Sequence, residues 1–539
     1  MGAIDAAGDS GNHFESSTCS HIMSREIELR FSIRPEDFAR LKKAQPRGFA
    51  AGPSATRKLS SVYYDTPDFE FAKAGLTLRV RKLGRQYVQT VKDESAGALA
   101  SDRGEYESKI GSATPDLQII PDSKTRSQLQ SIVDGGRVEP FVETKIRRTT
   151  RALKTQSGEH IELALDSGEI RTLANGRSVV PVSEIELELK HGSPIALYQA
   201  ARKLCHAAPL TISTESKVER GLRALEGREI GAQKAGKTEL AEDCVVEEAF
   251  RATLNHCLRH IARNTGAVAE ARDPEGIHQI RVGLRRLRAA LSAFGDAFRA
   301  PALEALRERA KTLADVFGET RELDVFALEL LAPIEELSNK PPGLPQLRLA
   351  LDEIRRECWD RAAELVRSDE FTGFLLDLAV AIESRVWRDG ANSEKFDEFL
   401  RPARSLAAES LEKCLKKGIR RARRLTQLDT DQRHRLRIEL KRLRYTAEFF
   451  APLFPAKAVS PFLERLSKLQ DLFGTMNDAA TAAHILRRIN EHAGARGGPE
   501  RAEAAAFVDG WHQSQVGPTW DKAQKRWKRF IKATPFWHE

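Results

Sequence analysis

Long apolar runs and paired cysteines are missing from this sequence. No stretch among its 539 residues approaches ~18 uninterrupted apolar residues, so a membrane-spanning helix is not expected. The six cysteines are scattered and form no Cys-x-x-Cys pair, which argues against a disulfide scaffold or a zinc site. Unpaired thiols are typical of a reducing compartment, so we expect a cytoplasmic protein.

A strong excess of one charge is also missing. The net charge is only +9, from 86 Lys and Arg against 77 Asp and Glu, so the position of the charges must decide their meaning. Hydrophobic residues make up 41% and charged residues 30%, which excludes a disordered chain and indicates more than one globular domain. Residues 1–22 lack the pattern of a signal peptide; we expect a flexible leader, after which Met23 could serve as a start.

The chain changes character near residue 226. Between residues 23 and 225, polar and apolar residues alternate in short runs that are separated by Gly, Pro and Asp. This period of two predicts antiparallel strands. Residues 226–243 are polar and predict a linker, whereas residues 244–535 show helical periodicity. We therefore predict an α+β multidomain protein, with an antiparallel β domain before an all-α domain.

The polar faces of the strands carry rows of charged residues. The rows are Glu26, Glu28 and Arg30 in the first strand, Arg79 and Arg81 in a later one, and Glu184, Glu186 and Glu188 in the last. Neighbouring like charges repel, so an acidic row favours a bound cation or an opposing basic row. Carboxylates suit Mg²⁺ or Mn²⁺, guanidinium groups suit phosphate, and a closed barrel would bring the rows together. A sheet with one solvated, charge-balanced face explains the spacing equally well.

A series of short motifs occupies these strands. They are Glu26-Ile27-Glu28-Leu29-Arg30, Tyr63-Tyr64-Asp65-Thr66, Leu78-Arg79-Val80-Arg81, Thr90-Val91-Lys92, Arg103-Gly104-Glu105, Arg148, Ile161–Asp166, Glu184–Leu189 and Ser216-Lys217. In this order, over residues 23–225, they resemble the CYTH domain, which is the triphosphate tunnel metalloenzyme family. The family has Lys where Arg30 stands here. Arg keeps the positive charge but is a wider, planar group.

The resemblance implies an antiparallel barrel whose tunnel binds a linear triphosphate and one or two divalent cations. The implied metal ligands, for Mg²⁺ or Mn²⁺, are Glu26, Glu28, Asp166, Glu186 and Glu188. The implied phosphate-binding residues are Arg30, Arg79, Arg81, Lys92, Arg103, Arg148 and Lys217. Catalysis is assigned to Glu26, Glu28, Arg30, Lys92 and Glu105. Glu105 could position metal or water, or pair with a tunnel arginine, and the register leaves open whether Arg147 or Arg148 faces inward.

The helical half contains an internal repeat. His278–Arg288 recurs as His434–Arg444, and Phe317-Gly318 recurs as Phe473-Gly474, both at an offset of 156 residues. A constant offset indicates a duplication. At ~100° per residue, the basic side chains of each motif form a stripe that borders the apolar stripe. The first motif has no acid and the second has only Glu439, so we predict an anion-binding groove rather than a solvated face. For the basic helix at residues 416–424, a solvated face remains a fair alternative.

The repeated motifs, together with Gly318, Arg321, Glu322 and Asp324, resemble the CHAD domain, the conserved histidine α-helical domain that often accompanies CYTH. The resemblance covers residues 244–535 and implies two pseudo-symmetric helical bundles around a groove for inorganic polyphosphate. The implied polyphosphate-binding residues are His278, Arg281, Arg285, Arg286, Arg288, His434, Arg437, Lys441, Arg442 and Arg444.

Taken together, these patterns predict a metal-dependent inorganic triphosphatase with an attached polyphosphate-binding module. Its partners would be triphosphate and polyphosphate, without a membrane or a specific nucleic acid, and polyphosphate granules are a candidate location. One alternative is a polyphosphate-binding protein without catalysis. Another is a related tunnel enzyme, a thiamine triphosphatase or a class IV adenylate cyclase, although all six Trp lie at or after Trp359 and leave few aromatic residues to clamp an organic group. Nucleic-acid binding lacks a recognisable module and stacking aromatics.

Overall fold

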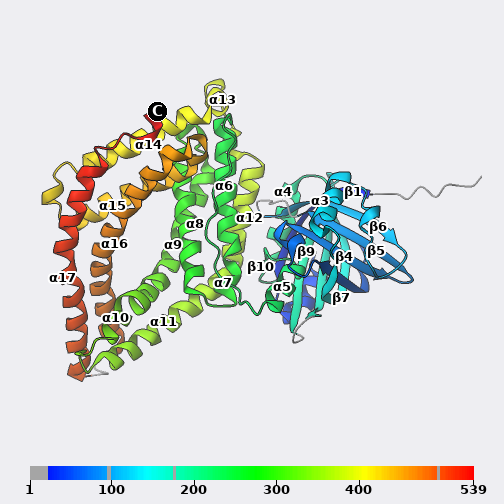
Figure 1. Ribbon diagram of the computed structural model, residues 1–539, viewed down its shortest axis with the longest axis horizontal. Coiled ribbons are helices and arrows are strands. Elements are labelled where there is room, and N and C mark those ends of the chain that lie inside the picture. The colour runs from blue at the N-terminus through cyan, green and yellow to red at the C-terminus, as the bar shows by residue number, and fades with distance from the viewer. Residues whose placement is uncertain (1–21, 94–98, 174–177, 495–497, 539) are drawn as a thin grey trace, which may run out of the picture.

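The computed structural model describes residues 22–93, 99–173, 178–494 and 498–538, and the predicted leader lies outside these residues. A sheet domain and a helical domain lie side by side (Figure 1). The last helix of the sheet domain, α5 (Lys217–Leu225), and the first helix of the helical domain, α6 (Val246–Arg263), are joined by a segment without helix or strand over residues 226–243. None of the described helices combines the length and the apolar character needed to cross a bilayer.

The sheet domain is built from antiparallel strands. They are β1 (Ile22–Ser32), β2 (Ala50–Ala51), β3 (Ala55–Asp65), β4 (Leu76–Leu83), β5 (Gln86–Asp93), β6 (Ser101–Ile110), β7 (Glu139–Lys154), β8 (His160–Thr172), β9 (Val179–His191) and β10 (Thr211–Ile212). The pairing runs β1-β6-β5-β4-β3-β7-β8-β9, and β9 pairs with β1 again. The long strands therefore form a circuit with an inner and an outer face.

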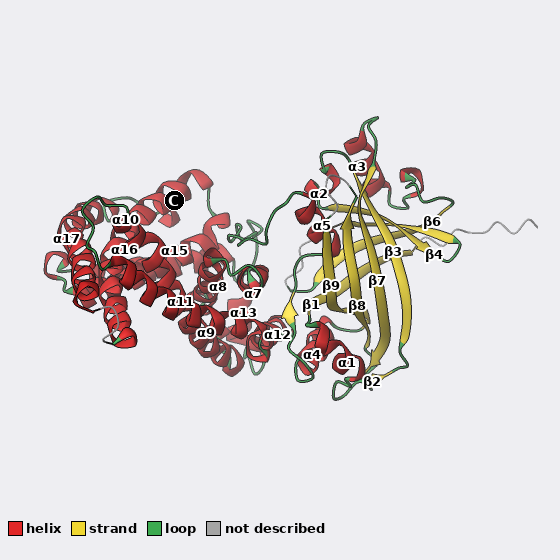
Figure 2. Cartoon of the chain, turned by 90° about the horizontal axis from the view of Figure 1, so that it is seen from below, coloured by secondary structure: helices red, strands yellow, loops and turns green. Residues whose placement is uncertain are grey.

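The outer face of this circuit is the apolar one. Leu78 of β4 and Val91 of β5 pack with Phe71 of α2 (Glu70–Lys73) and Leu129 of α3 (Ser123–Val133). Helices α1 (Phe38–Lys43) and α4 (Pro194–Leu204) lie near one end of the strands, and α2, α3 and α5 lie near the other (Figure 2). Because side chains alternate along a strand, burying the apolar residues outside turns the charged residues inward.

The helical domain repeats one arrangement of helices. Its elements after α6 are α7 (Thr265–Ala269), α8 (Pro274–Ala293), α9 (Pro301–Val325), α10 (Ala332–Glu335), α11 (Leu344–Arg367), α12 (Asp369–Glu383), α13 (Ser393–Leu400), α14 (Ala403–Arg421), α15 (Thr430–Phe450), α16 (Ala456–Ala493) and α17 (Gly498–Phe530). Helix α8 packs on α9, α15 packs on α16, and α8 contacts α15. The first residues of α8 and α15 are separated by the 156 residues of the sequence repeat.

The two domains share a specific interface in which α4 packs against α12. Arg202 of α4 donates to Asp369 at 2.6 Å, and Gly373 lies so close that a Cβ there would be 2.8 Å from the Arg202 guanidinium carbon. The Thr372 hydroxyl donates to the carbonyl of Leu210 at 2.5 Å. One apolar cluster extends through both domains, so the helical domain is docked on the sheet domain rather than merely tethered to it.

Candidate active site and basic groove

The circuit of strands encloses a cavity of about 290 Å³ whose wall is mostly charged. It is lined by Glu26, Glu28, Arg30, Arg79, Arg81, Lys92, Glu105, Arg148, Asp166, Glu186, Glu188 and Lys217. These residues come from seven strands and one helix, yet alternation along each strand turns its charged side chains into one lumen. They include every sequence-predicted tunnel residue except Arg103, whose side chain lies outside the described residues.

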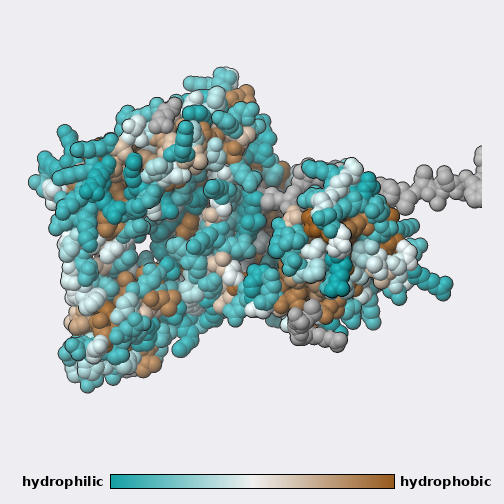
Figure 3. All heavy atoms as spheres, in the orientation of Figure 1, coloured by the Kyte–Doolittle hydropathy of each residue, from teal (hydrophilic) through white to brown (hydrophobic). Residues whose placement is uncertain are grey.

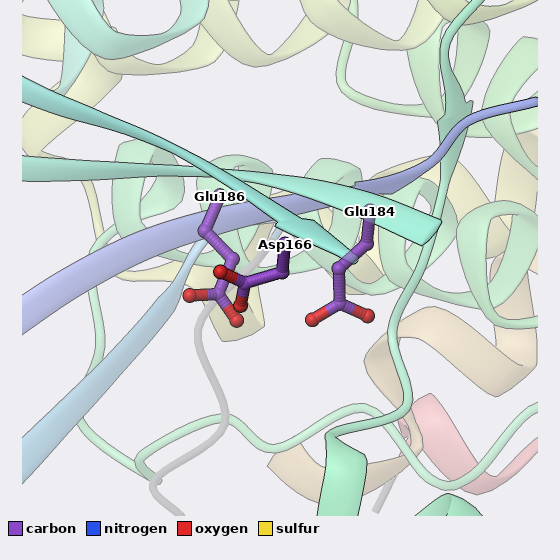
Figure 4. Close-up of side chains that lie close together, drawn as sticks. All are labelled: Asp166, Glu184 and Glu186. Atoms are coloured by element: carbon purple, nitrogen blue, oxygen red, sulfur yellow. The ribbon is translucent and has the colours of Figure 1, made fainter. Parts of the chain in front are cut away.

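At one end of the tunnel, three carboxylates meet three cationic side chains. Asp166, Glu184 and Glu186 can bring one oxygen each within 4.8 Å of the others (Figure 4). The Lys217 ammonium lies 2.8 Å from Asp166 and 2.6 Å from Glu186 and also contacts Glu184. The Arg148 guanidinium donates twice to Asp166, at 2.8 and 2.6 Å. The Arg220 guanidinium pairs with Glu184. These carboxylates could hold a metal ion, but Lys217, Arg148 and Arg220 already balance their charge.

A second row of carboxylates crosses three neighbouring strands. Glu162 of β8 lies opposite Glu188 of β9, and Glu188 lies opposite Glu28 of β1. Burial, helped by the charges of Glu186 and Glu26, raises the pKa of Glu28 to about 7 against the lowering effect of Arg30. Burial also raises the pKa of Glu188. Oxygen donors whose negative charge is this poorly compensated fit a hard divalent cation such as Mg²⁺ or Mn²⁺.

Glu162 is the member of this row that the sequence interpretation missed. The alternation of residues 161–166 places Glu162 on the same face as Asp166, and that pattern could have identified it. The structure also decides between the two adjacent arginines. Arg148 lines the tunnel, whereas Arg147 is exposed to solvent on the outer face.

The phosphate-binding candidates crowd the opposite wall. Arg79 donates to Thr90 at 2.9 Å, and Arg81 donates to Ser61 at 2.9 Å. Repulsion by Arg79, followed by burial, lowers the pKa of Arg81 to about 10, so an anion between the two guanidinium groups would be stabilised. Glu105 lies 3.1 Å from Lys92 and 3.9 Å from Arg79, so its observed role is to pair with tunnel cations.

In the helical domain, the repeated motifs bring basic side chains of α8 and α15 together. Burial and the charges of Arg437, Arg285 and Arg281 lower the pKa of Lys441 to about 6. Burial and Arg285 likewise lower the pKa of Arg281 to about 10. We call this set, Arg281, Arg285, Arg437 and Lys441, the basic groove. Its cations repel one another across the duplication, which is the electrostatic character of an anion-binding site.

Neighbouring helices complete the basic groove. Arg321 of α9 and Asp478 of α16 lie near enough to act on its pKa values, and burial followed by Arg321 lowers the pKa of His278 to about 4. Gly318 of α9 is required by close approach, because a Cβ there would lie 3.3 Å from the Arg281 guanidinium. The space-filling view shows the helical domain to be hollowed between its two halves (Figure 3).

Comparison with known families matches both halves of the chain. A family model described as CYTH domain matches residues 24–222, and one described as CHAD domain matches residues 252–487. The chain carries a CYTH domain followed by a CHAD domain. It is 29% identical over 209 residues to an inorganic triphosphatase of Haemophilus influenzae. The aligned stretch covers 37% of this chain and 55% of the relative. The match thus spans about half the length of that curated relative.

Solved structures resemble parts of the chain. The CHAD domain of the plant Ricinus communis is 29% identical, with a TM-score of 0.48, over 55% of this chain and 96% of that one. PptA from Streptomyces chartreusis is 17% identical, with a TM-score of 0.41, over 53% of this chain and 100% of that one. The PH1819 protein of Pyrococcus horikoshii is 18% identical, with a TM-score of 0.24, over 38% of this chain and 99% of that one.

Within the CHAD domain, not every sequence-predicted residue lies in the basic groove. Arg286 is only 6% exposed, forms an ion pair with Glu448 and stacks on Phe449 at 5.1 Å, so the expectation that it contacts a ligand is corrected: it joins α8 to α15. Arg442 lines a different cavity, on the side of α15 that faces α14. Arg444 is paired with Glu448 at 2.8 Å.

The histidines of the two motifs differ in their surroundings. His278 is half-buried beside the basic groove, whereas His434 is exposed and lies 3.2 Å from the side-chain oxygen of Asn477. Arg288 continues the stripe of α8 beyond Arg285 and is partly buried. The two copies of the repeat therefore resemble each other more closely in their backbone and in the cations of the basic groove than in the surroundings of their histidines.

Proposed function

We propose that the CYTH tunnel hydrolyses inorganic triphosphate to diphosphate and phosphate with Mg²⁺ or Mn²⁺, and that the CHAD groove binds inorganic polyphosphate. The observation that supports the first part best is the division of the tunnel wall. Carboxylates Glu28, Glu162 and Glu188 face a wall that carries Arg79, Arg81 and Lys92. A metal-bound triphosphate needs both kinds of wall at once.

The side chains have separate tasks in this mechanism. Arg79, Arg81 and Arg148 bind phosphate oxygens and offset the charge that develops on the leaving diphosphate. Glu26, Glu28, Glu162 and Glu188 would hold the divalent cation, which would polarise the phosphoryl group when bound. Glu105 holds Lys92 and Arg79 in place through its ion pairs with both.

Turnover assays test this assignment. The full-length chain should release phosphate from triphosphate with Mg²⁺ or Mn²⁺ and lose this activity with a chelator. Glu28→Gln, which keeps the size of the side chain, should be inactive although its circular dichroism and melting temperature stay close to wild type. A protein that is inert towards triphosphate with both metals would overturn the proposal.

One observation favours a second candidate, an organic triphosphate. A cavity of about 610 Å³ shares Tyr63, Thr77 and Val218 with the tunnel and is also lined by Phe69 and Phe141. Phe69 has a positive φ of 58°, and its ring packs edge-on against Phe141 at 5.4 Å. These aromatic residues are more than the sequence led us to expect near the tunnel. A panel of triphosphate, thiamine triphosphate and ATP separates the candidates: faster turnover of an organic substrate would favour this second one.

The basic groove supports the second part of the proposal. A linear polyanion would relieve the repulsion among Arg281, Arg285, Arg437 and Lys441 without any metal. Binding should weaken steeply with salt, because each phosphate contact releases condensed counterions. Titration of the full-length chain with polyphosphate at several salt concentrations measures this, and affinity that is independent of salt would contradict it.

A further inference from the structure

A large cavity lies on the side of α15 that faces α14. It has a volume of about 1430 Å³ and is enclosed by α14, the turn between α8 and α9, and Arg442 and Thr446 of α15. We call it the α14 cavity. Its basic lining residues include Arg307, Lys413, Lys416, Lys417, Arg420 and Arg442. The residues of α14 among them belong to the basic helix for which the sequence left a solvated face as an alternative.

The acidic residues of this cavity are already engaged. Glu304 pairs with Arg307 at 2.9 Å, and Glu398 and Glu409 both pair with Arg401. Glu412 accepts from Trp537 at 3.2 Å and lies 3.0 Å from His538. By contrast, Lys413 and Arg420 have no ion-pair partner among the described residues. The uncompensated charge inside the α14 cavity is therefore positive, and it suits an anion.

The α14 cavity continues the basic groove along both repeated helices. On α8, Arg281, Arg285, Arg288 and Ser292 succeed one another at spacings of four, three and four residues, which keeps them on one face. Arg281 and Arg285 belong to the groove, and Ser292 lines the cavity.

Arg288 lies between groove residue Arg285 and cavity residue Ser292 on α8, and its Nε is buried without a hydrogen-bond partner in the described structure. On α15, groove residue Lys441 is followed directly by cavity residue Arg442. Neighbouring residues of a helix point ~100° apart, so the groove and the cavity occupy adjacent sides of α15.

We propose that the α14 cavity is a second polyphosphate site, which holds the stretch of a long chain that extends beyond the basic groove. This inference rests on the proposed polyphosphate binding by the groove and adds a dependence on chain length. A polyphosphate fits better than a nucleic acid because the only aromatic side chain that lines the cavity in the described structure, Phe298, is 2% exposed and cannot stack on a base.

Two triple variants of matched charge test the proposal in the full-length protein. The cavity variant carries Lys413→Gln, Arg420→Gln and Arg442→Gln. The control carries Arg421→Gln, Arg423→Gln and Arg424→Gln, which are exposed, lie next to α14 or at its end, and do not line the cavity. All proteins also carry Glu28→Gln and are kept in chelator, so that the tunnel does not consume the ligand. Affinity is measured for inorganic tetraphosphate and for long-chain polyphosphate.

The cavity variant should bind long chains at least tenfold more weakly than the control variant, and its salt dependence should fall by about 2 in log–log slope, at ~0.7 per lost contact. Tetraphosphate affinity should stay within twofold in both. Equal losses of long-chain affinity in the two variants would overturn the α14 cavity as a site. Full-strength binding of both ligands by a groove variant, Arg281→Gln, Arg285→Gln and Arg437→Gln, would instead overturn the groove itself.

Discussion

The tunnel and the basic groove both contain buried lysines and arginines, but these cations have different neighbours in the two regions. In the tunnel, cations are paired with carboxylates, as Lys92 is with Glu26 at 2.5 Å and Arg148 with Asp166 at 2.6 Å. In the groove, cations face cations, and the pKa of Lys441 is lowered to about 6 by burial and by three arginines. A site that is to break a phosphate chain needs carboxylates for a metal, whereas a site that only holds the chain does not. The comparison separates catalysis from retention.

The largest effect should come from removing one tunnel carboxylate. Glu28→Gln should lower metal-dependent triphosphate turnover at least about 100-fold, because an amide is a poor replacement for a charged ligand. Polyphosphate affinity of the same protein should not change, since Glu28 lines the tunnel and is not part of the basic groove. Steady-state phosphate release and a binding titration measure the two quantities. Glu36→Gln, at an exposed residue outside the tunnel, is the control.

The groove should give the reciprocal result. Arg281→Gln, Arg285→Gln and Arg437→Gln together should weaken polyphosphate binding by one to two orders of magnitude and lower the salt slope by about 2, at ~0.7 per contact. Triphosphate turnover should stay at the wild-type rate. If turnover fell with the affinity, the two regions would not act separately.

A smaller effect should follow pH. Because the pKa of Lys441 is about 6 in the free protein and a polyanion would raise it, binding should take up a proton above that pH. Affinity should therefore fall as pH rises above about 6, by at most ~10-fold per pH unit for one proton. Lys441→Arg stays charged and should flatten this profile. The charges around it, Arg281 and Arg285 of α8, Arg437 of α15 and Asp478 of α16, are present in both proteins. A wild-type profile that is flat between pH 6 and 9 would contradict this account.

The smallest effect is expected at Arg30. Arg30→Lys keeps the cation and introduces the residue that the CYTH family has at this position, so triphosphate turnover should be retained. Its Nε lies 3.7 Å from Glu28, which is a contact that a lysine ammonium can also make. Complete loss of turnover would show that the planar guanidinium group is essential, and that this tunnel works differently from those that carry lysine.

The alternation of charged residues was sufficient to predict which tunnel residues share a face. Glu28 and Arg79 could be placed there because a strand has an exact period of two. What the sequence could not supply was the cross-strand register. It decides that Glu162 lies opposite Glu188, and that Arg148 rather than Arg147 points inward.

The helical half was harder to predict residue by residue. A helical wheel places Arg285 and Arg286 only ~100° apart, so a basic run alone does not show where its groove face ends. Packing between the helices decides which of the two arginines faces the groove. Arg286 is buried against Phe449 and Glu448, whereas the charge of Arg285 lowers the pKa of Lys441. The interface of α4 with α12 could not be predicted from the sequence either. Arg202 and Asp369 lie 167 residues apart, and no sequence pattern links them.

The separation of catalysis from retention is tested most directly by phosphate release from inorganic triphosphate, measured side by side for the full-length wild type and the triple variant of Arg281, Arg285 and Arg437. Both proteins should turn over at the same rate with Mg²⁺, and neither should do so in chelator. Turnover that persists in chelator, or that is lost in the groove variant, would contradict the account.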